Sequence, residues 1–227
     1  MEFAIFFLLI IIYLYVLYKL VKDDYVFIRK NISIEQIFDL AFLALIGGTF
    51  FSRLFYFLFS PLKTGNVFFA TFSPGIGGFS LIGGVLGGLL TLLVVIRLKK
   101  APLGRLLDFF TLALLCILPI GFLAYSFLQK QPELYLFLLY AVLYFVLALF
   151  YFKSLYPKIL SKTQKEGNST LLFLIFFSLA SLCTAVINPI KGTITILSIE
   201  NLVLFVSFLI SISLLIQQEK TTKSKKK

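Results

Sequence analysis

Arg53 is the residue of this sequence whose position most needs a chemical explanation. It lies inside an apolar run that reads Ile46-Gly47-Gly48-Thr49-Phe50-Phe51-Ser52-Arg53-Leu54-Phe55-Tyr56. A cation in such a run costs several kcal/mol unless it reaches the headgroups, pairs with an anion or faces a polar cavity. Two interpretations follow. Either Arg53 extends to the outer headgroups, or its planar guanidinium holds the phosphate of an anionic lipid by two-point contact.

A glycine-rich segment follows Arg53 in the sequence. Its glycines are Gly75, Gly77, Gly78, Gly83, Gly84, Gly87 and Gly88. The last four form two overlapping Gly-xxx-Gly pairs, which let a second helix approach closely, and that packing role accounts for them. The first three indicate a loop or broken helix end within the membrane. Irregular backbone there lines a cavity and offers its N–H groups to an anion.

The sequence offers few of the residues that usually bind metals or act as catalytic bases. The sequence contains no histidine, so zinc, haem and imidazole acid–base chemistry lose their usual ligand or base. The two cysteines, Cys116 and Cys183, lie in apolar runs and are expected to be buried, inert thiols. We therefore predict no metal and no cofactor.

The elements that position these residues are transmembrane helices. Apolar residues make up 60% of the chain and charged residues 14%, and the mean hydropathy is +1.02. Soluble domains contain about 45–50% apolar and about 25% charged residues. The sequence thus predicts an all-α integral membrane protein. Its net charge of +11 is explained by a membrane rather than by nucleic acid.

Seven apolar runs are long enough to cross about 30 Å of hydrocarbon. They cover residues 3–21, 37–59, 77–96, 106–128, 134–152, 169–189 and 193–216. The first run is expected to remain as a helix, because no basic segment or small-residue cleavage site marks it as a signal peptide. We predict one seven-helix transmembrane domain over 1–218 and a disordered basic cytoplasmic tail over 219–227.

The basic residues predict the orientation. They gather after the first, third and fifth runs and in the tail, whereas the other loops carry only Lys63, Lys130 and Lys191. By the positive-inside rule the N-terminus lies outside and the C-terminus in the cytoplasm. Asp39 and Asp108 then lie near the cytoplasmic interface, where a solvated or capping role is expected. Glu200 lies in the outer part of the last span, on the side of Arg53.

These residues make the chain similar to the prolipoprotein diacylglyceryl transferase family, over about residues 10–217. Asp39-Leu40, Gly48, Arg53 and Tyr56 resemble its second-helix pattern D-L…G-x-x-x-G-x-R-x-x-Y. Gly77, Gly78, Ser80, Gly83, Gly84 and Gly87 match its G-G-x-S-x-H-G-G-x-x-G signature. Further matches are Asp108 in an S-D-F motif, Gln131 to Tyr135 in H-P-x-Q-L-Y-E and Leu197 to Leu202 in L-S-M-G-Q-L.

The resemblance implies a seven-helix enzyme of the bacterial cytoplasmic membrane, with its N-terminus outside. Such an enzyme moves diacylglycerol from phosphatidylglycerol to the lipobox cysteine of a preprolipoprotein. Its expected partners are phosphatidylglycerol or another anionic lipid, and preprolipoprotein signal peptides. The implied lipid- or phosphate-binding residues are Arg53, Tyr56, Gly77, Gly78, Ser80, Gly83 and Gly84. Asp39, Asp108 and Tyr135 are expected to be structural polar residues, and Glu200 is the candidate catalytic carboxylate.

Several reactive positions of the family hold other residues in this chain. Ile82 stands at the signature histidine, and Phe122 or Ser126 stands where the fourth helix has an arginine. Ser181 and Ala185 replace the arginine and glutamate of the sixth helix. Two functions therefore remain open, a divergent transferase with a low rate and a catalytically inactive relative that binds lipid or assists assembly. A transporter or channel is a third class, but no paired discontinuous helices point to it.

Overall fold

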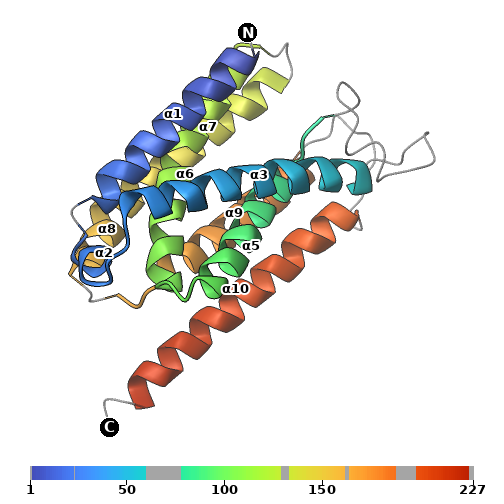
Figure 1. Cartoon of the computed structure of the whole chain (residues 1–227). Coiled ribbons are helices and arrows are strands. Elements are labelled where there is room, and N and C mark those ends of the chain that lie inside the picture. The colour runs from blue at the N-terminus through green and yellow to red at the C-terminus, as the bar shows by residue number, and fades with distance from the viewer. Residues whose placement is uncertain are drawn as a thin grey trace. The chain divides into compact units, whose positions relative to one another are not determined.

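The computed structural model describes residues 2–22, 24–59, 78–128, 133–161, 164–187 and 198–224. Within these ranges the regular structure is entirely helical, as predicted (Figure 1). The helices are α1 (Glu2–Val21), α2 (Tyr25–Arg29), α3 (Ile34–Phe59), α5 (Leu81–Leu98), α6 (Leu103–Ser126), α7 (Glu133–Phe150), a π-helical turn (Tyr151–Leu155), α8 (Tyr156–Leu160), α9 (Asn168–Ile187) and α10 (Ile199–Ser224).

The helices are those of a multi-pass membrane protein. In the part of the chain that the structure describes, six helical stretches are long and apolar enough to cross a membrane: Ala4–Val21, Ile34–Phe59, Leu81–Leu98, Leu103–Ser126, Leu134–Leu160 and Ile199–Lys220. The sixth predicted span corresponds to α9, whose apolar stretch Asn168–Thr184 is shorter. At about 1.5 Å per residue, the 20 residues of α9 still cover about 30 Å. The orientation in the membrane stays a prediction.

The helices group into two compact units. Unit 1 consists of Met1–Ala41 and Pro102–Ser169, and unit 2 consists of Phe42–Ala101 and Thr170–Lys227. The first residues of α3 thus belong to unit 1 and the rest of that helix to unit 2. The single domain over 1–218 stays a prediction.

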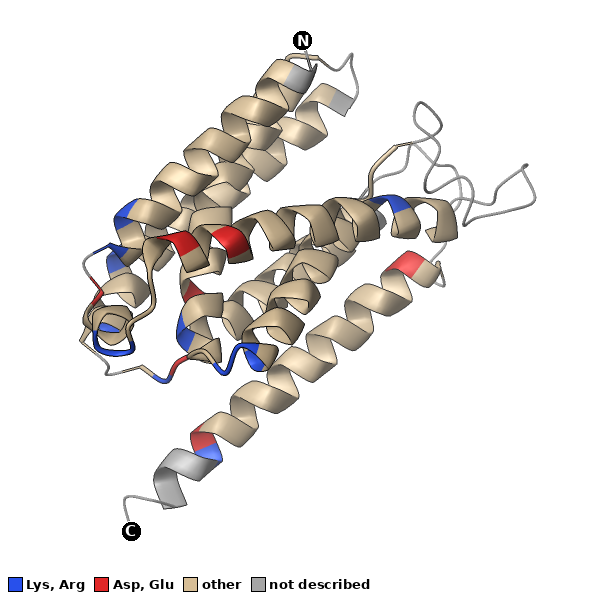
Figure 2. Ribbon diagram, in the orientation of Figure 1, with Lys and Arg blue, Asp and Glu red and all other residues tan. Residues whose placement is uncertain are grey.

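Unit 1 is built around α6, which packs against both α1 and α7 (Figure 1). Tyr13 of α1 meets Phe110 of α6 edge-on, with ring centroids 6.4 Å apart. Phe122 of α6 stacks on Tyr140 and Tyr144 of α7, at 5.0 Å and 5.5 Å. Along the ribbon of this unit, most of the coloured Lys, Arg, Asp and Glu positions lie toward the end where α2 and α8 are found (Figure 2).

Three parts of the fold differ from the sequence prediction. The short helix α2 was not predicted, and the fifth span continues beyond residue 152 through the π-helical turn and α8 to Leu160. The tail expected to be disordered from residue 219 is helical up to Ser224, because α10 continues through it. Gln217, Gln218, Glu219 and Lys220, at the junction with the apolar span, are good helix formers and favour continuation of the helix.

In unit 2, glycines let the helices α3 and α5 pack closely against each other. A Cβ added to Gly83 would lie 2.6 Å from the carbonyl oxygen of Phe51, and one added to Gly48 would lie 3.1 Å from that of Gly84. The Gly-xxx-Gly pairs therefore bring α5 directly against the backbone of α3, as their packing role predicts. In the same unit, Ser178 of α9 and Ser207 of α10 share a hydrogen bond of 2.7 Å.

Candidate lipid-binding site

Arg53 and Tyr56 provide the α3 side of the candidate site. They are three residues apart on one helix, so both side chains lie on the same face. Apolar residues surround them in the sequence, which places both within a helix long enough to span the membrane. A guanidinium and a phenol are thereby presented together in an otherwise apolar stretch.

The opposite side of the site is the short non-helical segment of residues 78–80, which leads into α5. Ser80 is the N-cap of that helix, and its hydroxyl oxygen accepts a hydrogen bond of 3.2 Å from the backbone N–H of Gly83. This cap fixes the point at which α5 begins. The serine of the predicted signature is thus structurally a helix cap.

Ser52 joins the two sides. Its hydroxyl donates a hydrogen bond of 2.7 Å to the carbonyl oxygen of Ser80, and the Ser80 N–H donates one of 3.0 Å to the carbonyl oxygen of Ser52. Both bonds link residues 28 positions apart in the chain. We call this pair of bonds the Ser52–Ser80 clamp. It fixes residues 78–80 against α3.

Arg53 faces an aromatic ring from that segment. Its guanidinium carbon lies 5.7 Å from the centroid of the Phe79 ring, the distance of a cation–π contact. Phe79 is 66% exposed, whereas Arg53 is half-buried. An aromatic ring contributes no formal charge, so this contact leaves the positive charge of the guanidinium unneutralised.

Gly78 and Tyr56 are also in contact. A Cβ on Gly78 would lie 3.0 Å from Cε2 of the Tyr56 ring, so only glycine lets the ring lie this close to the backbone without displacement. The Tyr56 hydroxyl can donate a hydrogen bond to a lipid oxygen. Arg53, Tyr56, Phe79 and the 78–80 backbone therefore form one cluster around the start of α5.

Gly83 and Gly84 support the cluster by packing. Phe51 and Phe55 leave no room for a side chain at Gly83, and Ser52 lies 3.5 Å from the position of a Cβ on Gly84. Gly83 thus lets α5 lie directly against α3 beside Arg53, whereas a methyl group at Gly84 would make only an ordinary contact. Their predicted contact with lipid stays a prediction. Gly77 lies outside the described residues, as does Gly75.

The electrostatics of the cluster favour an anion. The N-terminus of α5 carries the positive end of the helix dipole, equivalent to about half a charge. Arg53 adds a full positive charge beside it. A phosphate group would match both, and the surrounding apolar helix surface suits acyl chains.

Ile82 occupies the signature histidine position, in the first turn of α5. Its side chain is buried, with 6% of its surface exposed. An aliphatic side chain there cannot accept a proton from a substrate thiol. Ile82 therefore supplies no base to the cluster.

Glu200 lies in the first turn of α10, in the same unit. Ser198 precedes this helix and accepts a hydrogen bond of 3.2 Å from the N–H of Asn201. A carboxylate in the first turn interacts favourably with the helix dipole, so Glu200 has a structural role at the start of α10. Its predicted catalytic role stays a prediction.

The three residues expected to be structural lie in unit 1. Asp39 is exposed on α3, and Tyr135 is 63% exposed on α7. Of the solvated or capping role expected for Asp108, the solvated alternative is wrong, because the residue is only 1% exposed and its carboxylate accepts a hydrogen bond of 2.7 Å from the Gly167 N–H. Asp108 thereby ties the loop before α9 to α6.

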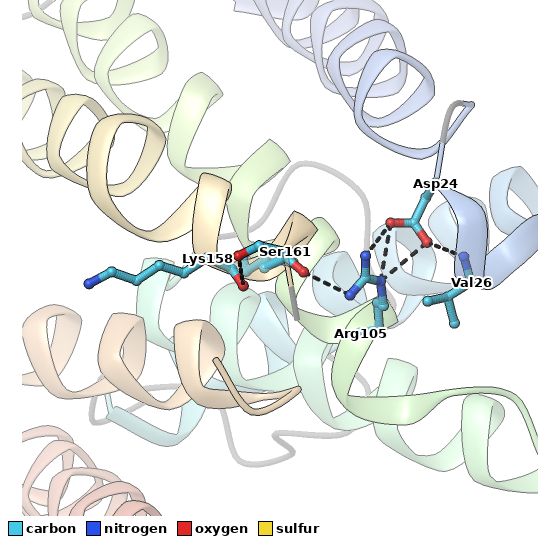
Figure 3. Close-up of polar contacts among 6 residues, drawn as sticks. Asp24, Val26, Arg105, Lys158 and Ser161 are labelled. Atoms are coloured by element: carbon cyan, nitrogen blue, oxygen red, sulfur yellow. Dashed lines mark hydrogen bonds and ion pairs between the residues drawn. The ribbon is translucent and has the colours of Figure 1, made fainter. Parts of the chain in front are cut away.

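Unit 1 contains an ion pair that the sequence did not indicate (Figure 3). Arg105 Nε lies 3.2 Å and 3.1 Å from the two carboxylate oxygens of Asp24, and its Nη1 donates a hydrogen bond of 2.9 Å to the carbonyl oxygen of Ile159. Asp24 also caps α2, since its Oδ1 accepts a 2.9 Å hydrogen bond from Val26. The capping pattern Asp24 before a short apolar run was the one sequence signal for α2.

Comparison with known proteins adds one match. A family model described as prolipoprotein diacylglyceryl transferase matches residues 2–131, which is more than half of the chain. This range includes Arg53, Tyr56, the 78–80 segment and the start of α5. No curated protein and no solved structure matches the chain.

Proposed function

Because the chain belongs to the prolipoprotein diacylglyceryl transferase family, we propose that it binds phosphatidylglycerol at the Arg53 cluster and transfers its diacylglyceryl group to a preprolipoprotein cysteine. The observation that carries the proposal is the guanidinium of Arg53, stacked on Phe79 within a membrane-spanning stretch. The proposed location is the bacterial cytoplasmic membrane, with the cluster toward the outer face.

The protein would recognise the lipid through hydrogen bonds from the Arg53 guanidinium to the lipid phosphate. The guanidinium has parallel N–H groups that can bond two phosphate oxygens at once, and such charge-assisted bonds are about twice as strong as neutral ones. The cation–π contact with Phe79 would restrict the guanidinium before the lipid arrives, so less side-chain freedom would be lost on binding. The apolar surfaces of the helices would accommodate the acyl chains.

The proposed reaction is a displacement at carbon. The cysteine sulfur forms a bond to C3 of the glyceryl group while the bond from C3 to the phosphate oxygen breaks. Glycerol phosphate leaves with that oxygen, and the thiol proton passes to the leaving phosphate or to water. Arg53 would stabilise the negative charge that develops on the phosphate as the bond breaks.

Ile82 favours a second candidate function, lipid binding without transfer. The side chain is aliphatic and buried at the place where the family signature has histidine. Removing one group that stabilises a transition state typically lowers the reaction rate by a factor of about 10²–10³. A protein with this substitution can keep the lipid site and lose the reaction.

A transfer assay separates the two functions. Purified protein would be mixed with phosphatidylglycerol and a synthetic lipobox peptide, and the peptide mass would be recorded over time. We expect slow addition of a diacylglyceryl group that requires phosphatidylglycerol and is lost with Arg53→Gln. Phosphatidylcholine, whose phosphocholine headgroup is zwitterionic and has no net charge, is the matched lipid control.

Two other outcomes would count against the transferase. If the protein retains phosphatidylglycerol but never modifies the peptide, the lipid-binding function replaces it. If neither binding nor transfer occurs, both functions are excluded.

A further inference from the structure

We propose that Ser52 is a positioning residue of the lipid site, through which the 78–80 segment is held in place for Arg53 to bind a phosphate. This inference rests on the function proposed above and adds a residue that the family signature motifs quoted for this chain do not include. Ser52 is 93% buried, since only 7% of its surface is exposed. It therefore does not contact the lipid itself.

The position of Ser52 in the chain explains why it matters. Ser52 immediately precedes Arg53, and Ser80 immediately follows Phe79. The Ser52–Ser80 clamp therefore joins the residues directly adjacent to the two partners of the cation–π contact. Any change in the clamp alters the distance between the guanidinium and the ring. The same shift moves Gly78 relative to Tyr56, which it contacts closely.

Only one bond of the clamp depends on the Ser52 side chain. The Ser80 N–H bond to the Ser52 carbonyl is backbone to backbone, and the carbonyl of Ser80 also accepts the helical hydrogen bond from Gly84 at 2.9 Å. The Ser80 hydroxyl continues to cap α5. Ser52→Ala should therefore leave α5 in place and loosen the 78–80 segment alone.

Unit 2 offers a matched control for a purely structural serine. Ser178 is fully buried, with 0% exposed, and its hydroxyl shares a 2.7 Å hydrogen bond with Ser207 between α9 and α10. Ser178→Ala also removes one interhelical hydrogen bond of a buried serine, but it does so outside the Arg53 cluster. Both alanine variants should lower the unfolding temperature by similar amounts.

The test is a double-mutant cycle on phosphatidylglycerol affinity. The wild-type protein, Ser52→Ala, Arg53→Gln, the double variant and Ser178→Ala would be titrated with phosphatidylglycerol in detergent. Because one hydrogen bond orients the site, we expect Ser52→Ala to weaken binding about fivefold and Ser178→Ala to leave it unchanged. In the Arg53→Gln background, Ser52→Ala should have no further effect, because Ser52 acts through the orientation of Arg53.

The outcomes distinguish this inference from the proposed function. If Arg53→Gln weakens binding but Ser52→Ala and Ser178→Ala bind as tightly as wild type, Ser52 is only structural and the inference is wrong. If Ser52→Ala weakens binding equally with and without Arg53, the residue does not act through Arg53. If Arg53→Gln changes nothing, the lipid site itself is wrong, and the proposed function fails first.

Discussion

Asp24 and Arg105, which are 81 residues apart in the sequence, form a buried ion pair in unit 1. The relative exposures of their side chains are 0% and 3%, respectively. The pair connects α2 to the start of α6, and the Arg105 bond to Ile159 extends the connection to α8. Phe27 of α2 packs on Phe109 of α6 beside it, with ring centroids 5.6 Å apart. Together these contacts hold a five-residue helix that could not be stable alone.

Replacing one partner of this ion pair should destabilise the protein strongly. Arg105→Gln leaves the Asp24 carboxylate buried without its counter-charge, which typically costs about 3–5 kcal/mol. We expect a large fall in the unfolding temperature of the purified protein in detergent, measured by the loss of helical circular dichroism. Arg97→Gln is the matched control, because Arg97 is exposed near the end of α5. Equal unfolding temperatures for the two variants would show that the buried pair contributes nothing.

Neighbouring glycines of α5 should differ in their tolerance of alanine. At Gly83 the added methyl would lie 2.6 Å from the backbone oxygen of Phe51, which cannot move aside without moving α3. At Gly84 the nearest atom would be 3.5 Å away, an ordinary contact. Gly83→Ala should therefore destabilise the protein by about 1–3 kcal/mol, the range for overpacking. Gly84→Ala should be neutral or stabilising, because alanine is the better helix former.

Thermal unfolding of both alanine variants measures this difference. The packing of α5 against α3 would be contradicted if Gly83→Ala were as stable as Gly84→Ala.

The predicted orientation can be tested by thiol labelling of intact cells. In a background of Cys116→Ala and Cys183→Ala, single cysteines at Asn66 and Gln131 should react with an impermeant reagent added outside. Cysteines at Lys30 and Lys99, which are exposed positions after the first and third spans, should stay unlabelled. This pattern follows from the positive-inside distribution of Lys and Arg. Labelling of the second pair alone would reverse the orientation.

The spans were predictable because a bilayer imposes a fixed length on apolar runs. The predicted second span, 37–59, corresponds to α3 at Ile34–Phe59, and the predicted first span, 3–21, corresponds to α1. The extension of the fifth span through the π-helical turn was not predictable from hydropathy, because Lys153 interrupts the apolar run there. The helix α2 depends on a distant arginine, so no local pattern indicates it strongly.

Part of the candidate site was predictable, since a charged residue in an apolar run and a cluster of glycines are both unusual in a membrane span. Arg53 and Gly78 were singled out on these grounds, and the structure brings both into one cluster. Ser52 and Phe79 were missed. A serine in an apolar helix carries no signal of its partner, and the clamp bonds residues 28 positions apart. Phe79 is one phenylalanine among 28, so only its position against Arg53 distinguishes it.

The most direct test of the account is the exchange of Arg53 for lysine. Lysine keeps the positive charge and also reaches headgroups, but it cannot make two parallel hydrogen bonds to one phosphate. If the Arg53 guanidinium binds phosphatidylglycerol by two parallel hydrogen bonds, Arg53→Lys should weaken the binding of this lipid by about 1–3 kcal/mol. The unfolding temperature should stay nearly unchanged. The measurement is the amount of phosphatidylglycerol that co-purifies with wild type, with Arg53→Lys and with Arg97→Lys as the control. Equal retention by all three proteins would contradict the account and leave Arg53 as a cation that merely extends to the headgroups.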